Sequence, residues 1–414
     1  MEHGKYQRKT CRYCETPLGE AFLDLGVQPL ANNLPRIEDS ATPEFRCPLA
    51  LVKCPRCHLV QLTHSVPAQL MFDEYLYVSS TTQTFRTHFA EYASDVKSRL
   101  GGKERPLAVD IGSNDGLLVS CYEKAGLRGI GVEPAKNLAK DANERGVITL
   151  NRYFDAQAVR EITEKFGKAD VVSANNVFAH IDDIRSVLEN VRALISDDGF
   201  FVIEFAYLVT MLEKMYFDMV YHEHVCYIGV AALDVFARLF DMELFDIGEV
   251  DTHGGSLRVF MQKKGGPRAR TSAVDRFLAV EKEKGCLDEG IYRRFADRVL
   301  GFRLRLNRML ADFKKEGKTV SGYGAPAKAT TIVNFCGFDF RMIDYIVDDN
   351  PLKQGRLVPG SGIPIVSSAR LKNHSTDYVL IFAWNFAPEI IKKSAYLKEK
   401  NVRFIVPLPE PRIL

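Results

Sequence analysis

Four cysteines near the start of the chain form two closely spaced pairs that could bind a metal ion. The pairs are Cys11-x2-Cys14 and Cys54-x2-Cys57. Two such pairs are typical of a closed structural zinc site, in which the metal replaces part of a hydrophobic core. Cys47 and His58 lie near the second pair and compete as ligands, but the matching spacings favour the four paired cysteines, with His58 at the surface.

A glycine-rich loop that follows the cysteines suits the binding of a nucleoside cofactor. It reads Asp110-Ile111-Gly112-Ser113-Asn114-Asp115-Gly116. Gly112 and Gly116 allow a tight turn and a close approach of the backbone to a ligand. The G-x-x-x-G spacing lacks the G-x-G-x-x-G of a dinucleotide-binding loop. This difference disfavours a pyrophosphate cofactor and favours S-adenosylmethionine.

Acidic side chains beside this loop are candidates for holding the cofactor. Asp110 is placed to bind the methionine ammonium group, directly or through water. Glu133 ends the next predicted strand, 21 residues after Gly112, where a carboxylate would bind both ribose hydroxyls. Further candidate contacts are Asn114, Asp115 and Asn175. The alternative is an ordinary glycine turn with a strand-end acid, which is disfavoured because loop and acid occur together at the expected separation.

A histidine-rich stretch could supply acid–base chemistry in the same crevice. Tyr221-His222-Glu223-His224 follows the fifth predicted strand, and a helix there would place Tyr221 and His224 on one face. His224 is then the candidate general base, and Glu223 the partner that orients it. His180 follows the fourth predicted strand, whose end faces the crevice. The alternatives are a metal site, for which the HExxH spacing is absent, a core tyrosine and a solvated glutamate.

Alternating strand and helix patterns organise the chain around these residues. Strands are predicted at 107–111, 129–133, 147–150, 170–174 and 200–205. With helices between them, they indicate a doubly wound parallel sheet. A helix is expected over about 76–105 and a late strand over 256–262. The predicted units are a zinc module (1–75), a cofactor domain (76–270), a charged helical bridge (271–316) and a smaller α/β domain (317–414).

The last unit begins with a second strand, glycine loop and helix. The loop, Tyr323-Gly324-Ala325-Pro326-Ala327-Lys328, suits a phosphate cradle of backbone amides with one cationic side chain. Lys328 is the candidate for a pyrophosphate, with a solvated lysine beside a structural turn as the alternative. Trp384 and Asn385 end a later strand and are candidates for contacting a base or sugar. Packing is the alternative for this single tryptophan.

Composition limits the class of protein. The 414 residues carry a net charge of +2, which is too balanced for a nucleic-acid binder or a membrane-surface protein. Residues 1–75 hold 8 Lys/Arg against 9 Asp/Glu, so the zinc module offers no basic footprint for RNA. No apolar run reaches the roughly 18 residues of a membrane helix, and the N-terminus lacks a signal peptide's apolar stretch. We expect a cytoplasmic monomer that binds neither nucleic acid nor membrane.

The order of motifs along nearly the whole chain resembles one family, the S-adenosylmethionine-dependent C-methyltransferases that act at C-3′ of nucleotide-linked keto-deoxysugars. The resemblance rests on the cysteine pairs, the first glycine loop and the segments 75–80, 174–176, 221–224, 253–255, 322–328, 334–337 and 382–385. It implies a structural zinc, a methyltransferase domain and a C-terminal domain that helps to bind a dTDP- or GDP-linked 4-keto-6-deoxyhexose. His222 and Ser256 depart from the family pattern, where an acid is familiar.

The resemblance also implies a set of active-site residues and a reaction. The residues fall on Tyr77, His180, Tyr221, Glu223 and His224. His224, held by Glu223, would remove the C-3′ proton beside a C-4′ ketone, and Tyr77 or Tyr221 would donate to the enolate oxygen. An O- or N-methyltransferase of a small metabolite is the main alternative; a nucleic-acid methyltransferase and a non-catalytic sugar-nucleotide binder are weaker ones. The predicted fold class is α/β, with two Rossmann-like domains behind the zinc module.

Overall fold

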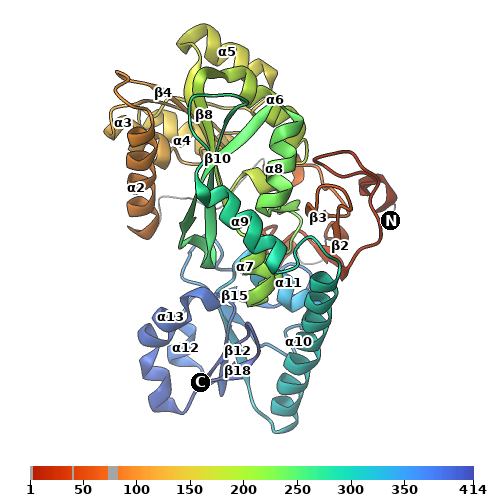
Figure 1. The fold of residues 1–414 in the computed structure, drawn as a ribbon. Helices are drawn as coiled ribbons and strands as arrows, with labels where there is room; N and C mark the ends of the chain where they lie inside the picture. Colours follow the sequence, from red (N-terminus) through yellow and green to blue (C-terminus); the bar gives the residue numbers. More distant parts are fainter. Residues whose placement is uncertain (1–2, 40–41, 73–82) are drawn as a thin grey trace.

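The computed structural model describes residues 3–39, 42–72 and 83–414 and arranges them around three β-sheets. Figure 1 shows a central unit above, a C-terminal unit below and an N-terminal module beside both. Within these described ranges, no helix combines the length and the apolar character that crossing a membrane requires. The mixed α/β class expected from the sequence is confirmed.

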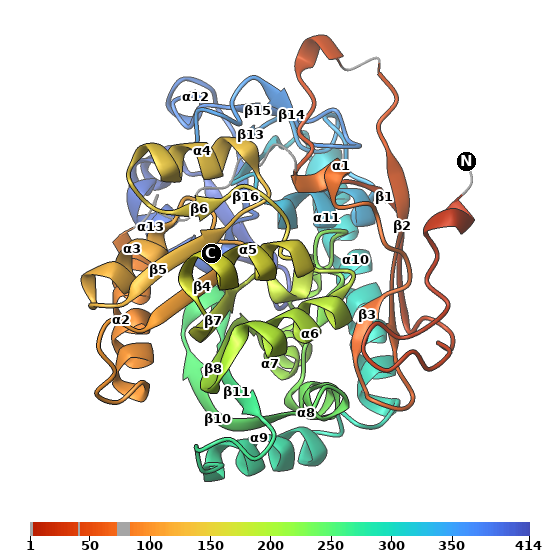
Figure 2. The same ribbon diagram turned by 90° about the horizontal axis from the view of Figure 1, so that it is seen from above.

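The central sheet has the strand order β10-β11-β8-β7-β4-β5-β6. Its strands are β4 (Leu107–Ile111), β5 (Arg128–Val132), β6 (Thr149–Leu150), β7 (Ala169–Asn175), β8 (Ile195–Ala206), β10 (Met242–Val250) and β11 (Ser256–Lys263). The strands from β4 to β8 pair in parallel, as predicted. They are apolar along their length because helices cover both faces of the sheet. Figure 2 shows this arrangement from above.

The sequence pattern does not predict strand β10, and a bulge in its pairing is the reason. It lies antiparallel to β11, which in turn lies antiparallel to β8. The register of β10 shifts between Leu244 and Asp246. Such a bulge interrupts the period-two alternation by which a strand is detected in a sequence.

Thirteen described α-helices surround the sheets. They are α1 (Gln69–Phe72), α2 (Gln83–Arg99), α3 (Leu117–Lys124), α4 (Lys136–Glu144), α5 (Ala156–Phe166), α6 (Ile184–Leu194), α7 (Leu208–Lys214), α8 (Val230–Leu239), α9 (Ser272–Glu283), α10 (Gly290–Lys315), α11 (Ala327–Cys336), α12 (Arg370–Asn373) and α13 (Ala387–Lys393). The long α10 buries Tyr292, Phe295, Val299, Phe302, Leu306 and Leu310. This spacing of three and four residues forms one apolar stripe along the helix.

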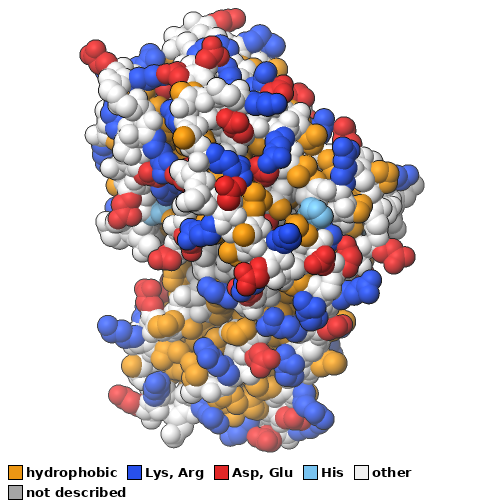
Figure 3. Space-filling model, viewed as in Figure 1, with side chains coloured by type: hydrophobic (Ala, Val, Ile, Leu, Met, Phe, Trp, Pro, Cys, Tyr) orange, Lys and Arg blue, Asp and Glu red, His pale blue; other side chains and the backbone are white. Residues whose placement is uncertain are grey.

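The C-terminal sheet has the order β14-β15-β13-β12-β16-β17-β18. Its strands are β12 (Val320–Tyr323), β13 (Ile346–Val347), β14 (Arg356–Leu357), β15 (Pro364–Val366), β16 (Tyr378–Ile381), β17 (Arg403–Val406) and β18 (Arg412–Ile413). Strand β12 is flanked by β13 on one side and β16 on the other, all parallel. The strand order therefore reverses between β12 and β16, where ligands bind in open α/β sheets. In Figure 3 hydrophobic side chains gather over the unit that this sheet forms.

The N-terminal module is joined to both other units. Its antiparallel sheet consists of β1 (Leu23–Pro29), β2 (Arg46–Lys53), β3 (Val60–Leu62) and β9 (Cys226–Tyr227). Because β9 comes from the segment that carries the predicted catalytic histidines, the module shares a sheet with that segment. The module therefore supports the central unit directly.

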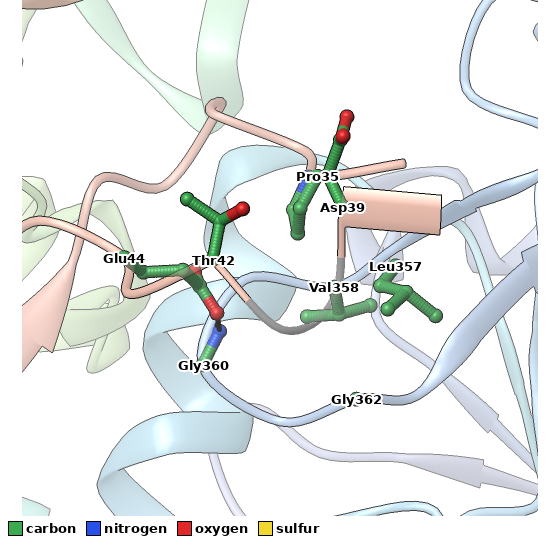
Figure 4. Close-up of a pocket in the computed structure, with 8 residues that line it drawn as sticks. All are labelled: Pro35, Asp39, Thr42, Glu44, Leu357, Val358, Gly360 and Gly362. Atoms are coloured by element: carbon green, nitrogen blue, oxygen red, sulfur yellow. Dashed lines mark hydrogen bonds between the residues drawn. The ribbon is translucent and has the colours of Figure 1, made fainter. Parts of the chain in front are cut away.

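The N-terminal module also meets the C-terminal unit, around a cavity of about 210 Å³. Figure 4 shows residues from both units lining it. Both carboxylate oxygens of Glu44 accept from the backbone N–H of Gly360 at 2.9 Å. Arg46 donates to the carbonyl of the same glycine, and Arg356 donates to the carbonyl of Leu34. These contacts fix the module against β14 and the loop that follows it.

Candidate active site

The four paired cysteines converge at one end of the N-terminal module. Their Sγ atoms all lie within 4.8 Å of one another. The closest distances join Cys11 to Cys57 at 3.4 Å and Cys14 to Cys54 at 3.5 Å. Thiolates bound to a tetrahedral zinc ion at about 2.3 Å stand about 3.8 Å apart. The donor set and its spacing therefore fit a structural zinc ion.

The two competing ligands lie outside this cluster in the part of the chain that the structure describes. Cys47 is buried in β2, and its backbone carbonyl lies 3.0 Å from Nε2 of His222. His58 has a positive φ of 63° and donates its backbone N–H to the carbonyl of Cys54. Its backbone therefore closes the turn after the second cysteine pair.

The first glycine loop turns between β4 and α3 in the way its glycines require. Gly112 and Gly116 have φ values of 64° and 76°, which residues with a Cβ rarely adopt. A Cβ on Gly112 would also lie 2.6 Å from Cγ2 of Val177. The Glu133 carboxylate accepts from the backbone N–H groups of Asn114 and Ala135, both at 2.8 Å. Glu133 thus joins the loop to the end of β5 and keeps further lone pairs for a ligand.

Unsatisfied polar atoms around this loop indicate where a ligand binds. Ser113 Oγ, Asp115 Oδ1 and Asn175 Oδ1 are buried and lack a hydrogen-bond partner among the described residues. Buried polar groups are normally hydrogen-bonded, so these atoms are the expected contacts of a polar ligand. S-Adenosylmethionine carries an ammonium group, a carboxylate, ribose hydroxyls and an adenine, which can supply the missing partners. The residues at the loop therefore fit this cofactor.

Asp110 lies beneath the loop with a perturbed acidity. Burial raises its pKa to about 7, and the charge of Glu133 adds to the effect. Hydrogen bonds from Ser173 Oγ at 2.7 Å and Asn175 Nδ2 at 3.5 Å oppose the shift. Near neutral pH this carboxyl group is therefore poised between its neutral and charged forms.

We expect the affinity for S-adenosylmethionine to rise with pH up to about 7. Below that pH the Asp110 carboxyl group is protonated, and it must release its proton to pair with the cationic cofactor. Binding should weaken by up to about tenfold per pH unit. Calorimetry at pH 6 (roughly one unit below the pKa) in buffers of different ionisation enthalpy should show proton release. Asp110→Asn should remove the slope, and a slope that persists would contradict the prediction.

Tyr221 and His224 meet in a turn, whereas a helix was considered from the sequence. The turn is closed by the His224 N–H, which donates to the carbonyl of Tyr221 at 2.9 Å. The Tyr221 hydroxyl lies 2.9 Å from Nε2 of His224, and Nδ1 of the same ring lies 2.8 Å from the carbonyl oxygen of Met219. Because a carbonyl can only accept, Nδ1 carries the hydrogen. In the neutral ring, Nε2 therefore holds the lone pair and accepts from the tyrosine.

His180 lies against this pair from another element. It ends a short 3-10 helix (Phe178–His180) that follows β7. Its ring centroid is 4.8 Å from that of His224, with the two rings edge to face at 72°. The structure thus brings together the two histidines that the sequence placed after different strands.

The role expected of Glu223 needs a correction. Its Oε1 accepts from the side-chain amide of Asn32 at 2.6 Å, in the N-terminal module. The Met219 carbonyl, and not the Glu223 carboxylate, is the acceptor for Nδ1 of His224. His222 points the same way as Glu223, toward the carbonyl of Cys47. The side chains of the turn therefore fall into two groups: Tyr221 and His224 contact each other, and the two residues between them bind the N-terminal module.

A second group of side chains joins the central and C-terminal units. Asp218 is buried, and its carboxylate accepts from the indole Nε1 of Trp384 at 2.5 Å. The indole contacts the ring of Tyr216, at 4.4 Å between centroids, and the ammonium of Lys328 lies 4.5 Å from the indole centroid. Burial raises the pKa of Asp218 to about 6, although the charge of Lys328 opposes this. Burial lowers the pKa of Lys328, which the charge of Asp218 partly offsets.

The remaining predicted residues are placed as follows. The Tyr323 hydroxyl donates to Asp349 Oδ2 at 3.0 Å, and Asn385 is exposed. Tyr77 lies outside the described residues.

A cavity of about 310 Å³ opens beside Tyr216 and Trp384. Sequence reasoning missed Tyr216 and Asp218, although a lone carboxylate in the apolar run 215–220 was a usable signal.

Lys328→Gln should weaken binding of a phosphorylated substrate while leaving the catalytic rate nearly unchanged. A charge-assisted hydrogen bond from a half-buried ammonium is worth about 10–100-fold in affinity. Steady-state kinetics should show this loss in KM. Lys318→Gln is the matched control, because Lys318 pairs with Asp377 in the same unit. Equal KM values for the two variants would contradict the prediction.

The matches to known protein families extend over nearly the whole chain. Three family models match: a zinc binding domain over residues 11–72, a methyltransferase domain over 85–245 and a C-methyltransferase C-terminal domain over 251–409. C-methyltransferase NovU of Streptomyces niveus is 38% identical over 404 residues, which are 98% of this chain and 96% of NovU.

Solved methyltransferase structures match over a part of the chain. The plantazolicin methyltransferase BpumL in complex with SAH is 12% identical, covering 44% of this chain and 86% of that chain with a TM-score of 0.36. The magnesium protoporphyrin IX methyltransferase ChlM of Synechocystis PCC 6803 with bound SAM is 14% identical, covering 45% and 86% with a TM-score of 0.33. Because NovU matches nearly end to end, the chain belongs to the S-adenosylmethionine-dependent C-methyltransferases, in the family of NovU.

Proposed function

We propose that this enzyme methylates C-3′ of a nucleotide-linked 4-keto-6-deoxyhexose by way of an enolate. The observation that carries the proposal is the fixed tautomer of His224, whose Nδ1–H is held by the Met219 carbonyl so that Nε2 is a base. Methylation of carbon needs such a base, since a C–H bond must first be ionised. Methylation of an amine or a hydroxyl group uses a lone pair that is already present, so it depends less on a base.

Tyr221 is the proposed donor to the enolate oxygen. Its hydroxyl donates to Nε2 of His224 at 2.9 Å. Turning this O–H toward the ketone oxygen of a bound sugar frees the Nε2 lone pair, which can then take the C-3′ proton. One rotation therefore supplies both the donor and the base. His180, at 4.8 Å between ring centroids, is the proposed contact that positions the sugar beside His224.

The nucleotide is proposed to bind where the C-terminal sheet reverses its strand order. The Gly324 loop after β12 and the residues after β16 meet there so closely that a Cβ on Gly324 would lie 2.6 Å from the Cβ of Ala383. Lys328 and Trp384 extend from these two segments. An ammonium and an indole ring suit the pyrophosphate and the base of a dTDP- or GDP-linked sugar.

S-Adenosylmethionine, held at the first glycine loop, supplies an electrophilic methyl group on a sulfonium. The chain's own residues then have three tasks: to hold that loop through Glu133, to bind the sugar nucleotide between the two units, and to exchange one proton at C-3′ through His224. These tasks explain why one chain carries two Rossmann-like units that face a shared turn.

The test is a panel of dTDP- and GDP-linked 4-keto sugars incubated with 13C-methyl-labelled S-adenosylmethionine. NMR should show the label bonded to C-3′, and deuterium should exchange at C-3′ in heavy water. A label on oxygen or nitrogen, or transfer to the same sugar reduced to its 4′-alcohol, would contradict the proposal. Transfer to the 4′-alcohol would support an O- or N-methyltransferase.

A further inference from the structure

Arg12, between the first two zinc ligands, binds the segment that follows His180. Its Nε donates to Asp182 Oδ1 at 2.9 Å, and its side chain is fully buried. Its two Nη atoms donate to the Leu62 carbonyl at 2.8 Å and to Ser65 Oγ at 2.6 Å. Ser65 in turn donates to the same Asp182 oxygen at 2.6 Å. The guanidinium thus joins the metal-binding turn, the end of β3 and the loop after His180.

Tyr13, the other residue between these ligands, makes a parallel connection. Its ring stacks on Phe236 of α8 at 4.0 Å between centroids, and Phe236 contacts Phe178 at 6.4 Å. Phe178 begins the short helix that ends at His180. Arg185 donates to the Tyr13 carbonyl at 2.6 Å. Figure 1 shows the N-terminal module beside α8. Both residues of the Cys11–Cys14 turn therefore hold the His180 segment.

We propose that Arg12 and Asp182 are positioning residues through which the zinc-bound turn sets the place of His180 against His224. This inference rests on the proposed function for the roles of the two histidines. A zinc ion fixes the backbone of residues 11–14, and the rigid planar fork of Arg12 transmits that position to Asp182. Lysine cannot reproduce the contact, since its donors radiate from one nitrogen, whereas Arg12 uses three separate nitrogens of a planar fork.

The test observes the histidine rings directly, without substrate. We would record the 1H–13C resonances of the histidine Cε1 atoms in the full chain and assign two of them with His180→Gln and His224→Asn. Asp182→Asn and Arg12→Lys should shift the His180 and His224 resonances. Glu15→Gln is the matched control, because it breaks the Arg185–Glu15 ion pair between the same two segments but leaves Arg12 in place.

Zinc removal adds a second arm to this experiment. A chelator should move the His180 resonance in the wild type, and it should move it less in Asp182→Asn, where the Arg12–Asp182 connection is weakened and only the Tyr13 contacts remain at full strength. If Asp182→Asn left both resonances unchanged, or if Glu15→Gln shifted them equally, the proposal would be overturned.

Steady-state kinetics distinguishes a displacement of His180 from a general loss of structure. Asp182→Asn should lower kcat by about 10–100-fold, as expected when a catalytic group is displaced by about 1 Å, and should leave the dissociation constant for S-adenosylmethionine unchanged. An equal loss of cofactor affinity would indicate a general loss of structure and overturn the proposal. Because the resonances are measured without substrate, a different methyl acceptor would overturn the proposed function and leave this result standing.

Discussion

His224→Asn should reduce methyl transfer by about 10²–10⁴-fold, the usual contribution of a positioned general base. Asparagine can keep a hydrogen bond to the Met219 carbonyl, but it offers no basic nitrogen at the place of Nε2. Deuterium exchange at C-3′ of the bound sugar should fall in parallel, since both reactions need the same proton transfer. The measurement is initial-rate kinetics together with NMR of the exchange.

The control for this prediction is His222→Asn. His222 is buried beside the Cys47 carbonyl, so its replacement tests packing against the N-terminal module and leaves the base in place. It should lower stability more than it lowers the exchange rate per folded molecule. If His224→Asn kept both exchange and turnover, the base would have to be another residue.

Cys54→Ser should abolish zinc binding and destabilise the metal-binding end of the N-terminal module. Structural zinc sites contribute about 10–16 kcal/mol of apparent binding free energy in small zinc-binding peptides, and in such sites binding and folding are coupled. The module here has its own sheet and is joined to two other units, so we expect part of it to melt separately and at lower temperature. Metal analysis and calorimetry, with and without a chelator, measure both effects.

Cys47→Ser is the matched control for the zinc site. Cys47 is buried at the start of β2 and lies outside the group of four thiols. This variant should retain one zinc ion per chain and melt only slightly below the wild type. Loss of zinc in Cys47→Ser, or full retention in Cys54→Ser, would show that the ligand set is different.

The turn at 221–224 shows which contacts can be predicted from a sequence pattern and which cannot. The residue types of Tyr221 and His224 indicated a tyrosine–histidine pair, and a turn closed by one hydrogen bond brings them together as a helix would have done. The partner of Nδ1 could not be predicted, because it is a backbone carbonyl and every residue has one. Glu223 was assigned to that role from its neighbouring position, yet its carboxylate faces Asn32.

The sequence by itself determined the features that depend on local chemistry. Paired cysteines indicate zinc because two thiols with two residues between them reach one ion. The glycines of the first loop stand where φ is positive, and the parallel strands appear as short apolar runs. Each of these signals lies within a few residues, so it is visible without knowledge of the fold.

Only the tertiary structure decided which distant side chains meet. Asn32 and Glu223 are 191 residues apart, and Asp218 and Trp384 are 166 apart. Contacts of this kind depend on how three sheets pack together, and the packing follows from buried area summed over many residues rather than from any one motif. For that reason the zinc site and both glycine loops were recognisable in the sequence, whereas the contacts that join the turn at 216–224 to Asn32 and to Trp384 were not.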